Sequence, residues 1–159
     1  MRSWVQVLVP EADHKENKCA AKIILKQRLK GKEAMIHDEV NVLRALDHSH
    51  IVKLISRAEQ VLHGNSAGFW GDLSRRISDG GRFTEKDASR TIRQVLNAID
   101  YIHAQNVVHR DQKPENLAYL TKEANSALLL VDFGIATTLD GPDAVSRLTS
   151  GSLGYGAPE

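Results

Sequence analysis

The stretch His109-Arg110-Asp111-Gln112-Lys113-Pro114-Glu115-Asn116 is the most informative part of this 159-residue sequence. It is followed by Asp132-Phe133-Gly134 and, at the end of the sequence, by Ala157-Pro158-Glu159. The first stretch places an acid, an amine and an amide close together in one loop, and the second begins with another acid. Side chains of these types in this order predict a shared site rather than unrelated surface residues.

The four polar residues match the needs of phosphoryl transfer to a hydroxyl group. That reaction needs a group that orients the hydroxyl, metal ions on the phosphates and a fixed cation beside them. Asp111 is the candidate base, and Lys113 can offset the negative charge that develops on the transferred group. Asn116 and Asp132 offer oxygen ligands of the kind that Mg²⁺ prefers. Any one of them alone could be a solvated loop residue, but the ordered set favours a catalytic site.

In order, the three motifs resemble the catalytic loop, the metal-binding Asp-Phe-Gly and the end of the activation segment of eukaryotic protein kinases. The resemblance implies an α+β, two-lobe fold that uses ATP and Mg²⁺ to phosphorylate protein hydroxyls. Lys113 is similar to the lysine of serine/threonine kinases rather than of tyrosine kinases. We expect residues 1–159 to form one partial kinase domain, with the small lobe over about 1–70 and the large lobe from about 71.

The same resemblance implies roles for residues outside the catalytic loop. Lys22 is expected to touch the ATP phosphates and to pair with Glu39, although a surface charge is the alternative for each. Arg110 is expected to receive a phosphorylated residue of the activation segment, for which Thr149 is our choice. Ser152 is expected to contact the catalytic loop instead.

Three apolar or aromatic residues match members of the stacked spine of active kinases: Leu43, His109 and Phe133. Packing in the core is the alternative interpretation of these residues, and it agrees with the first. The segment from Gly71 through His103 resembles the calcium/calmodulin-dependent group of kinases. The calcium/calmodulin-binding tail of that group would lie beyond Glu159.

The sequence also departs from the kinase pattern. We find no Gly-rich loop over the ATP site, because Val5 stands where its last glycine is expected. The composition of Ser56–Trp70 is unsuited to a buried strand and hinge. The helices that form the floor of the large lobe would follow Glu159, so we expect an apolar stripe on the helix after Thr84 to be partly uncovered and to attract a regulatory partner. Its members are Ala88, Ile92, Val95 and Ile99.

Two functions are therefore carried forward. The first is an ATP-dependent serine/threonine protein kinase, although we expect no measurable turnover from this chain in isolation. The second is a catalytically dead kinase fragment or pseudokinase that binds proteins through its exposed faces. The retained lysine, acids and amide favour the first.

Composition excludes several other classes of protein. Lys and Arg total 21 against 20 Asp and Glu, so charge gives no reason to expect nucleic acid or an anionic membrane as a partner. The single cysteine, Cys19, excludes an internal disulfide framework and suits a reducing compartment. No signal peptide or membrane span is evident, so we expect an intracellular protein, in the cytoplasm or the nucleus.

Periodicity and turn residues predict the order of elements. Two strands are expected first, then a helix, a strand, a short helix, a long helix that begins after Thr84 and a hairpin beneath the site. Their predicted ranges are 4–9, 19–25, 32–46, 51–55, 71–79, 84–105, 117–120 and 127–131.

Overall fold

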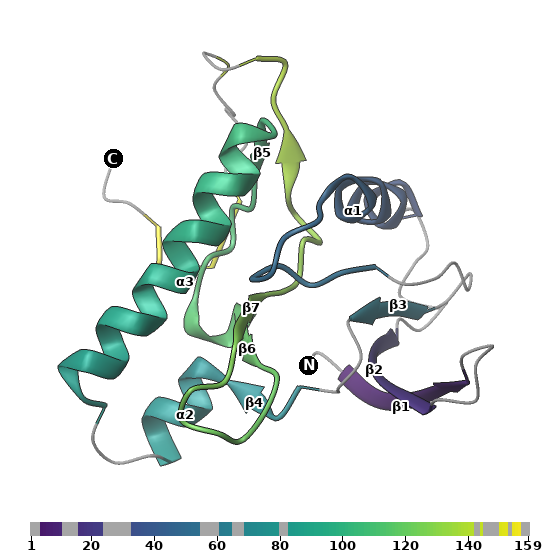
Figure 1. The fold of residues 1–159 in the computed structure, drawn as a ribbon. Helices are drawn as coiled ribbons and strands as arrows, with labels where there is room; N and C mark the ends of the chain where they lie inside the picture. The colour runs from purple at the N-terminus through teal and green to yellow at the C-terminus, as the bar shows by residue number, and fades with distance from the viewer. Residues whose placement is uncertain are drawn as a thin grey trace.

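A computed structural model describes residues 4–10, 16–23, 33–54, 61–64, 69–79, 83–141, 144, 150–152 and 154–156. The fold is α+β, as predicted, with a small sheet and one helix on one side and a larger, mainly helical part on the other (Figure 1). The larger part contains two helices, two small sheets and the motifs of the candidate site.

The small sheet has the antiparallel order β1-β2-β3 and is formed by Trp4–Pro10, Glu16–Ile23 and Val61–Gly64. The predicted first strand is confirmed, whereas the second begins three residues before the expected Cys19. Strand β3 lies within Ser56–Trp70, whose composition we expected to be unsuited to a buried strand; a strand is present there, and the burial of its side chains lies outside what the structure describes. Only four residues are needed to pair with β2, and Gly64 lies at the end of the strand, where a glycine costs little.

Helix α1, Glu33–Ala45, confirms the predicted helix within one residue at each end. The predicted strand over Ile51–Ile55 is wrong, because Ile51 makes only an isolated parallel bridge to Leu130. Backbone bonds still tie this segment to the larger part: Val52 N–H donates to the Leu130 carbonyl at 3.0 Å, and Leu130 N–H donates to the His50 carbonyl at 2.9 Å. The chain after α1 is therefore fastened beside the hairpin without forming a regular strand.

Helix α2, Leu73–Asp79, confirms the predicted short helix, but the two residues before it form strand β4, Gly71–Asp72. The long helix α3, Glu85–Ala104, begins where Thr84 predicted. Thr84 has an extended backbone conformation, and its side-chain oxygen accepts a hydrogen bond from Asp87 N–H at 3.1 Å. Thr84 therefore satisfies one of the unpaired donors of the first turn of the helix.

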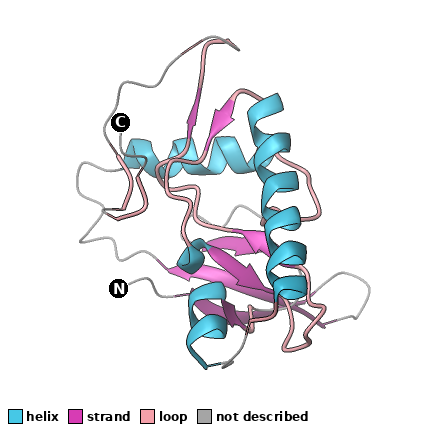
Figure 2. Cartoon of the chain, turned by 90° about the vertical axis from the view of Figure 1, so that its left-hand side faces the viewer, coloured by secondary structure: helices cyan, strands magenta, loops and turns pink. Residues whose placement is uncertain are grey.

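The predicted hairpin is confirmed as β6, Leu117–Tyr119, paired with β7, Leu128–Leu130. Strand β4 adds to its free edge, which gives the order β4-β6-β7. Figure 2 shows α3 running along this hairpin. A second pair, β5 (Val107–Val108) with β8 (Thr137–Thr138), was not predicted.

The core lies where α1, α3 and the hairpin meet. Leu128, Leu130, Ile102 and Phe133 are among its most buried side chains. These residues come from segments on both sides of the catalytic loop, so the same core that stabilises the fold also holds that loop in position. Its other buried apolar members include Val42, Leu43, Leu46, Ile51, Leu73, Ala98, Leu117 and Leu129.

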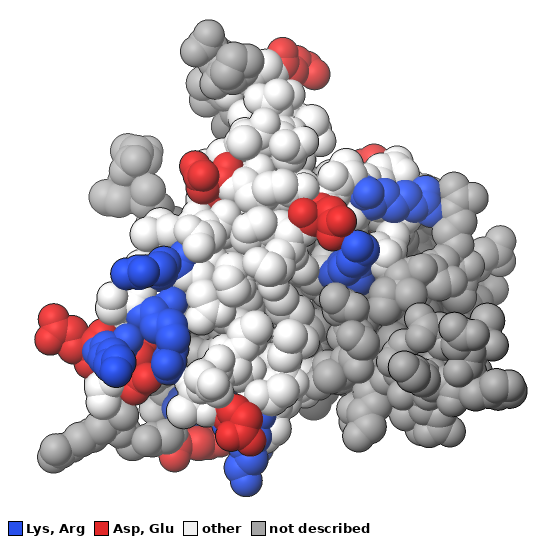
Figure 3. Space-filling model, in the orientation of Figure 1, with Lys and Arg blue, Asp and Glu red and all other residues white. Residues whose placement is uncertain are grey.

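Helix α3 buries only part of its apolar surface. Ala98 and Ile102 are buried, whereas Ile92 is 54% exposed and Leu96 is 57% exposed. The expected uncovered stripe is therefore present at Ile92, while Val95 and Ile99 are half-buried. On the face shown in Figure 3, acidic and basic side chains are interspersed, with several basic ones over the N-terminal half of α3. Among the described helices, none has a length and hydropathy that would let it cross a membrane.

Candidate active site

The catalytic-loop motif lies between two short strands that fix both of its ends. Strand β5 leads into His109, and the 3-10 helix η2, Pro114–Asn116, leads directly into β6. Arg110 has φ 66°, an uncommon value for a residue other than glycine, and the chain turns sharply there. The turn places Asp111 in the loop interior, where it is only 7% exposed.

Three side chains hold the Asp111 carboxylate. Lys113 Nζ donates to Oδ1 at 2.9 Å, and Ser152 Oγ donates to the same oxygen at 2.6 Å. Asn116 Nδ2 donates to Oδ2 at 2.9 Å and to the Asp111 backbone carbonyl at 2.5 Å. Lys113 also bonds Ser152 directly. Charge-assisted bonds of this kind are stronger than neutral ones, so the carboxylate is held firmly in one orientation.

His109 connects the loop to the Asp-Phe-Gly motif. Its side chain is fully buried, and its Nδ1 accepts a hydrogen bond from Asp111 N–H at 3.3 Å. Because Nδ1 is an acceptor, Nε2 is the protonated nitrogen, and it donates to the Val131 carbonyl at 3.1 Å. The His109 ring also meets the Phe133 ring edge-on, with centroids 4.7 Å apart. Two of the three residues expected to belong to the spine are therefore in contact.

Asp132 lies across a hollow from Asp111. It has φ 64°, and its side chain is half-buried. The hollow has a volume of about 230 Å³. Asp111, Lys113, Asp132 and Ser152 line it together with Gly134, Ile135 and Gly151. The structure therefore brings the two predicted acids and the lysine to one cavity.

The donor set of this site suits a hard divalent cation. Of the two predicted ligands, Asp132 lines the hollow, whereas Asn116 is fully buried and is not among the lining residues. The amide oxygen is the atom of Asn116 that would bind a cation, because the amide nitrogen donates twice to Asp111. Asp132 adds a carboxylate, and Mg²⁺ is commonly bound by one or two such oxygens together with substrate phosphates and water. No group of three His, Cys, Asp or Glu residues suited to a metal ion occurs among the described residues.

Comparison with known proteins matches the geometry. Residues 6–159 match the model of the protein kinase domain. The chain belongs to the protein kinase domain family. It is 49% identical over 157 residues to calcium/calmodulin-dependent protein kinase cmkA of Emericella nidulans, a match that covers 96% of this chain and 37% of the relative. It is 47% identical to a calcium/calmodulin-dependent protein kinase of Metarhizium anisopliae, with 96% and 41% covered.

A third relative extends the likeness to animals. The type 1 calcium/calmodulin-dependent protein kinase of Macrobrachium nipponense is 45% identical over 143 residues, which is 88% of this chain and 41% of the relative. The chain spans roughly two fifths of the length of these relatives, which have 37% and 41% of their residues covered.

Two predicted members of the kinase site, Lys22 and Glu39, lie in the small lobe. Lys22 is on β2, where its backbone is paired opposite Trp4 on one side and Leu62 on the other. Glu39 is on α1 and is only 4% exposed. Burial of an acid to this extent requires a partner. The Lys22 side chain lies outside what the structure describes, so the pair remains a prediction.

Arg110 is anchored within the kinase domain. Its Nε donates to the Ile135 carbonyl at 2.7 Å, which joins the catalytic loop to the segment after Asp-Phe-Gly. Its Nη1 is buried and has no hydrogen-bond partner within the described part of the chain. A buried donor of this kind costs about 1–3 kcal/mol if no acceptor reaches it. Thr149, our predicted phosphorylation site, lies outside the described residues.

Gly151 was not singled out from the sequence, yet its geometry sets the position of Ser152. It has φ 134°, and a Cβ atom placed on it would lie 3.0 Å from the Arg110 carbonyl oxygen. The backbone therefore approaches the catalytic loop too closely for a side chain. The sequence signal that could have indicated this close approach is a glycine directly before Ser152, the residue expected to contact the catalytic loop.

Proposed function

We propose that this chain carries the catalytic core of an ATP-dependent protein serine/threonine kinase. The observation that supports this most is the buried cluster in which Lys113, Ser152 and Asn116 all bond Asp111. A base that is held in one orientation beside an open cavity is what in-line transfer to a hydroxyl requires. The names of the relatives are consistent with this proposal.

In the proposed mechanism, Asp111 orients the substrate hydroxyl and accepts its proton as the hydroxyl oxygen bonds the γ-phosphorus of ATP. The bond between that phosphorus and its bridging oxygen breaks in the same step, and ADP leaves. Lys113 stays beside Asp111 and stabilises the charge on the transferred phosphoryl group. Asn116 and Asp132 would hold Mg²⁺, which when bound neutralises charge on the phosphates. Lys22 and Glu39 would position ATP from the small lobe.

Ser152 has a positioning role in this proposal. Its hydroxyl joins Asp111 and Lys113, which are otherwise held mainly by the loop itself. Because Ser152 belongs to the segment that precedes Ala157-Pro158-Glu159, the order of that segment controls the orientation of the base. We further propose that phosphorylation of Thr149 orders it through Arg110, whose buried Nη1 could donate to a phosphate oxygen.

The substrate class and regulation follow from the family. Lys113 favours serine and threonine hydroxyls as acceptors, and the relatives named above are calcium/calmodulin-dependent kinases. We therefore propose protein substrates, and calcium/calmodulin as the regulator of the complete protein.

The alternative function is a catalytically inactive protein-binding module. It rests on the exposed Ile92 and Leu96 of α3, which form an apolar surface that a partner could cover.

A phosphorylation assay of the complete protein, with Mg²⁺ and ATP, separates the two functions. Asp111→Asn should lower turnover by about 10²–10⁴-fold, because it removes a general base. Asp100→Asn is the matched control, since Asp100 is an exposed acid on α3, and it should leave turnover unchanged. If the complete protein transfers no phosphate, or if both variants have the same activity, the kinase proposal is wrong and the binding module becomes the better reading.

A further inference from the structure

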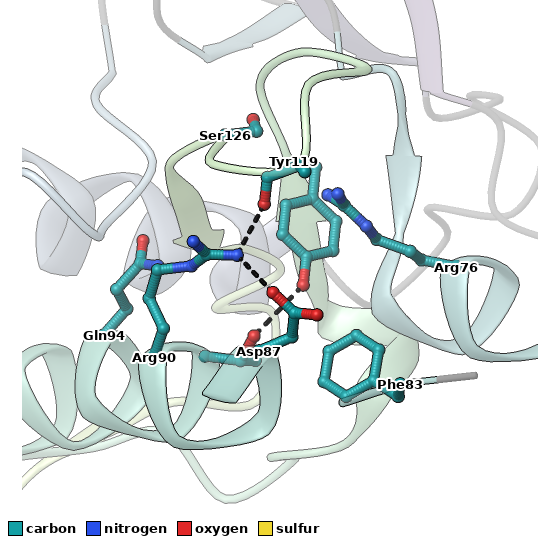
Figure 4. Close-up of a pocket in the computed structure, with 9 residues that line it drawn as sticks. Arg76, Phe83, Asp87, Arg90, Gln94, Tyr119 and Ser126 are labelled. Atoms are coloured by element: carbon teal, nitrogen blue, oxygen red, sulfur yellow. Dashed lines mark hydrogen bonds and ion pairs between the residues drawn. The ribbon is translucent and has the colours of Figure 1, made fainter. Parts of the chain in front are cut away.

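A second hollow lies away from the kinase site, between α2, the N-terminal half of α3 and the turn that joins β6 to β7 (Figure 4). It has a volume of about 240 Å³ and shares no lining residue with the hollow at Asp111. Most of its walls are polar, with Phe83 and Tyr119 as aromatic exceptions. The remaining lining residues are Arg76, Asp87, Arg90, Thr91, Gln94, Ala124 and Ser126.

Arg76 is held at one wall of this hollow in a fixed orientation. Its guanidinium carbon lies 4.3 Å from the centre of the Tyr119 ring, a cation–π contact, and Nη2 donates to the Glu123 carbonyl at 3.1 Å. Nη1 is buried, and no residue that the structure describes accepts a hydrogen bond from it. The Arg76 guanidinium is thus partly buried, with Nη2 hydrogen-bonded and Nη1 without an acceptor among the described residues.

The other arginine of the hollow is already satisfied. Arg90 Nη2 donates to Asp87 Oδ1 at 2.7 Å and to the Ala124 carbonyl at 2.7 Å. The Thr84 hydroxyl, which bonds Asp87 Oδ2, and the nearby Arg90 hold the pKa of Asp87 below its usual value. Asp87 is therefore ionised at neutral pH; Arg90 bonds it directly and Arg76 also lowers its pKa through charge, so one acid faces two arginines and the described lining keeps one net positive charge.

We propose that this hollow binds a carboxylate group, with Arg76 as its principal donor. A planar carboxylate matches the guanidinium fork, and one negative charge matches the one unbalanced positive charge. A phosphate dianion suits the site less well, because ionised Asp87 would repel its second charge. Phe83 and Tyr119 provide apolar surface for the carbon chain that carries the acid, as a glutamate side chain does.

The carboxylate could come from a glutamate of a partner protein or from a free organic acid. The two sources are distinguished by titrating the ¹⁵N-labelled chain with N-acetylglutamate and with the blocked peptide Ala-Glu-Ala, while amide shifts are followed by NMR. Saturable shifts at residues 73–79, 83–94 and 119–126 are expected with one or both. Tighter binding of the peptide indicates a protein source, and tighter binding of N-acetylglutamate indicates a free acid.

Two comparisons decide whether the site is real. The blocked peptide Ala-Gln-Ala has nearly the same shape as Ala-Glu-Ala but no carboxylate, and we expect it to bind at least about tenfold more weakly because charge-assisted bonds are stronger. Arg76→Gln should weaken N-acetylglutamate by about tenfold or more. Arg75→Gln is the matched control, because Arg75 is the neighbouring residue on α2, is 71% exposed and pairs with Asp79. It should change the affinity less than twofold.

Arg76→Lys keeps the charge and covers the case in which Arg76→Gln fails to fold. It should bind N-acetylglutamate with intermediate affinity, since the ammonium lacks the planar fork. Equal binding of the blocked peptides Ala-Glu-Ala and Ala-Gln-Ala, equal effects of the Arg75 and Arg76 substitutions, or equally tight binding of inorganic phosphate would each overturn the carboxylate site.

Discussion

Two of the isoleucines of helix α3 lie in such different environments that the same substitution should destabilise the chain by very different amounts. Ile102 is 0% exposed, whereas Ile92, ten residues earlier on the same helix, is 54% exposed. Both lie within the helix, so Ile→Ala changes helix propensity by a similar amount at each site, in favour of alanine. Any difference between the variants therefore reports packing.

The expected magnitudes follow from burial. Ile102→Ala removes buried methyl and methylene groups from the core and should lower the free energy of unfolding by about 2–5 kcal/mol. Ile92→Ala should cost under about 1 kcal/mol, because about half of its surface is already in water and alanine recovers some helix propensity. For a domain of this size the first loss lowers the melting temperature by roughly 4–20 °C, and the second by no more than a few degrees.

Urea unfolding followed by circular dichroism measures both free energies with one method. The slope of the transition should remain the same in both variants, since neither substitution changes the surface that unfolding exposes by much. A loss of more than about 2 kcal/mol for Ile92→Ala would refute the reasoning, because it would mean that this face of α3 is covered in solution. A loss at Ile102 as small as that at Ile92 would refute the placement of the core.

Two further predictions concern the catalytic loop and the start of α3. Gly151→Ala should destabilise the chain more than Gly154→Ala in thermal unfolding, by roughly 1–3 kcal/mol. Both glycines have positive φ, but only the first would place a Cβ atom 3.0 Å from the Arg110 carbonyl. Thr84→Val should lower the melting temperature by about 2–4 °C at pH 7, because it removes the helix cap. The lowered pKa of Asp87 contributes stability that is present above the ordinary carboxyl pKa and lost as pH falls through the folded pKa, so the two melting curves should draw closer at pH 3.

The catalytic loop could be predicted from sequence because its chemistry is local. Asp111, Lys113 and Asn116 lie within six consecutive residues, and a rigid loop of that length must bring their side chains together. The contact of Ser152 with Asp111 spans 41 residues and was reached only through the resemblance to kinases. Periodicity alone could not have found it, since no regular pattern links those two segments.

The elements that were missed are short or depend on distant partners. Strands β5 and β8 have two residues each, too few for any alternation to be visible. Strand β3 forms because β2 offers it an edge, which the composition of its own segment does not reveal. Arg76 is a related case: nothing near it in sequence indicates Tyr119, the ring on which its guanidinium rests.

Backbone strain at the site points to function independently of the motifs. Asn106, Arg110 and Asp132 have φ values of 55°, 66° and 64°. Asn106 follows the end of α3, where asparagine commonly adopts this conformation, so it needs no special account. Arg110 and Asp132 are not at a helix end, and each left-handed conformation costs about 1–3 kcal/mol and persists only where neighbouring bonds enforce it.

The bonds that enforce it are those of the proposed active site. Arg110 is tied to the Ile135 carbonyl, and His109 joins Asp111 to Val131, the residue before Asp132. The two strained residues are thus held on either side of one buried histidine, and the strain turns both acids toward the same hollow. A chain that needed these segments only as connections could relax both residues into ordinary conformations. Arg110 and Asp132 are instead held in the strained conformation. This favours a function for Asp111 and Asp132 over a role in packing alone.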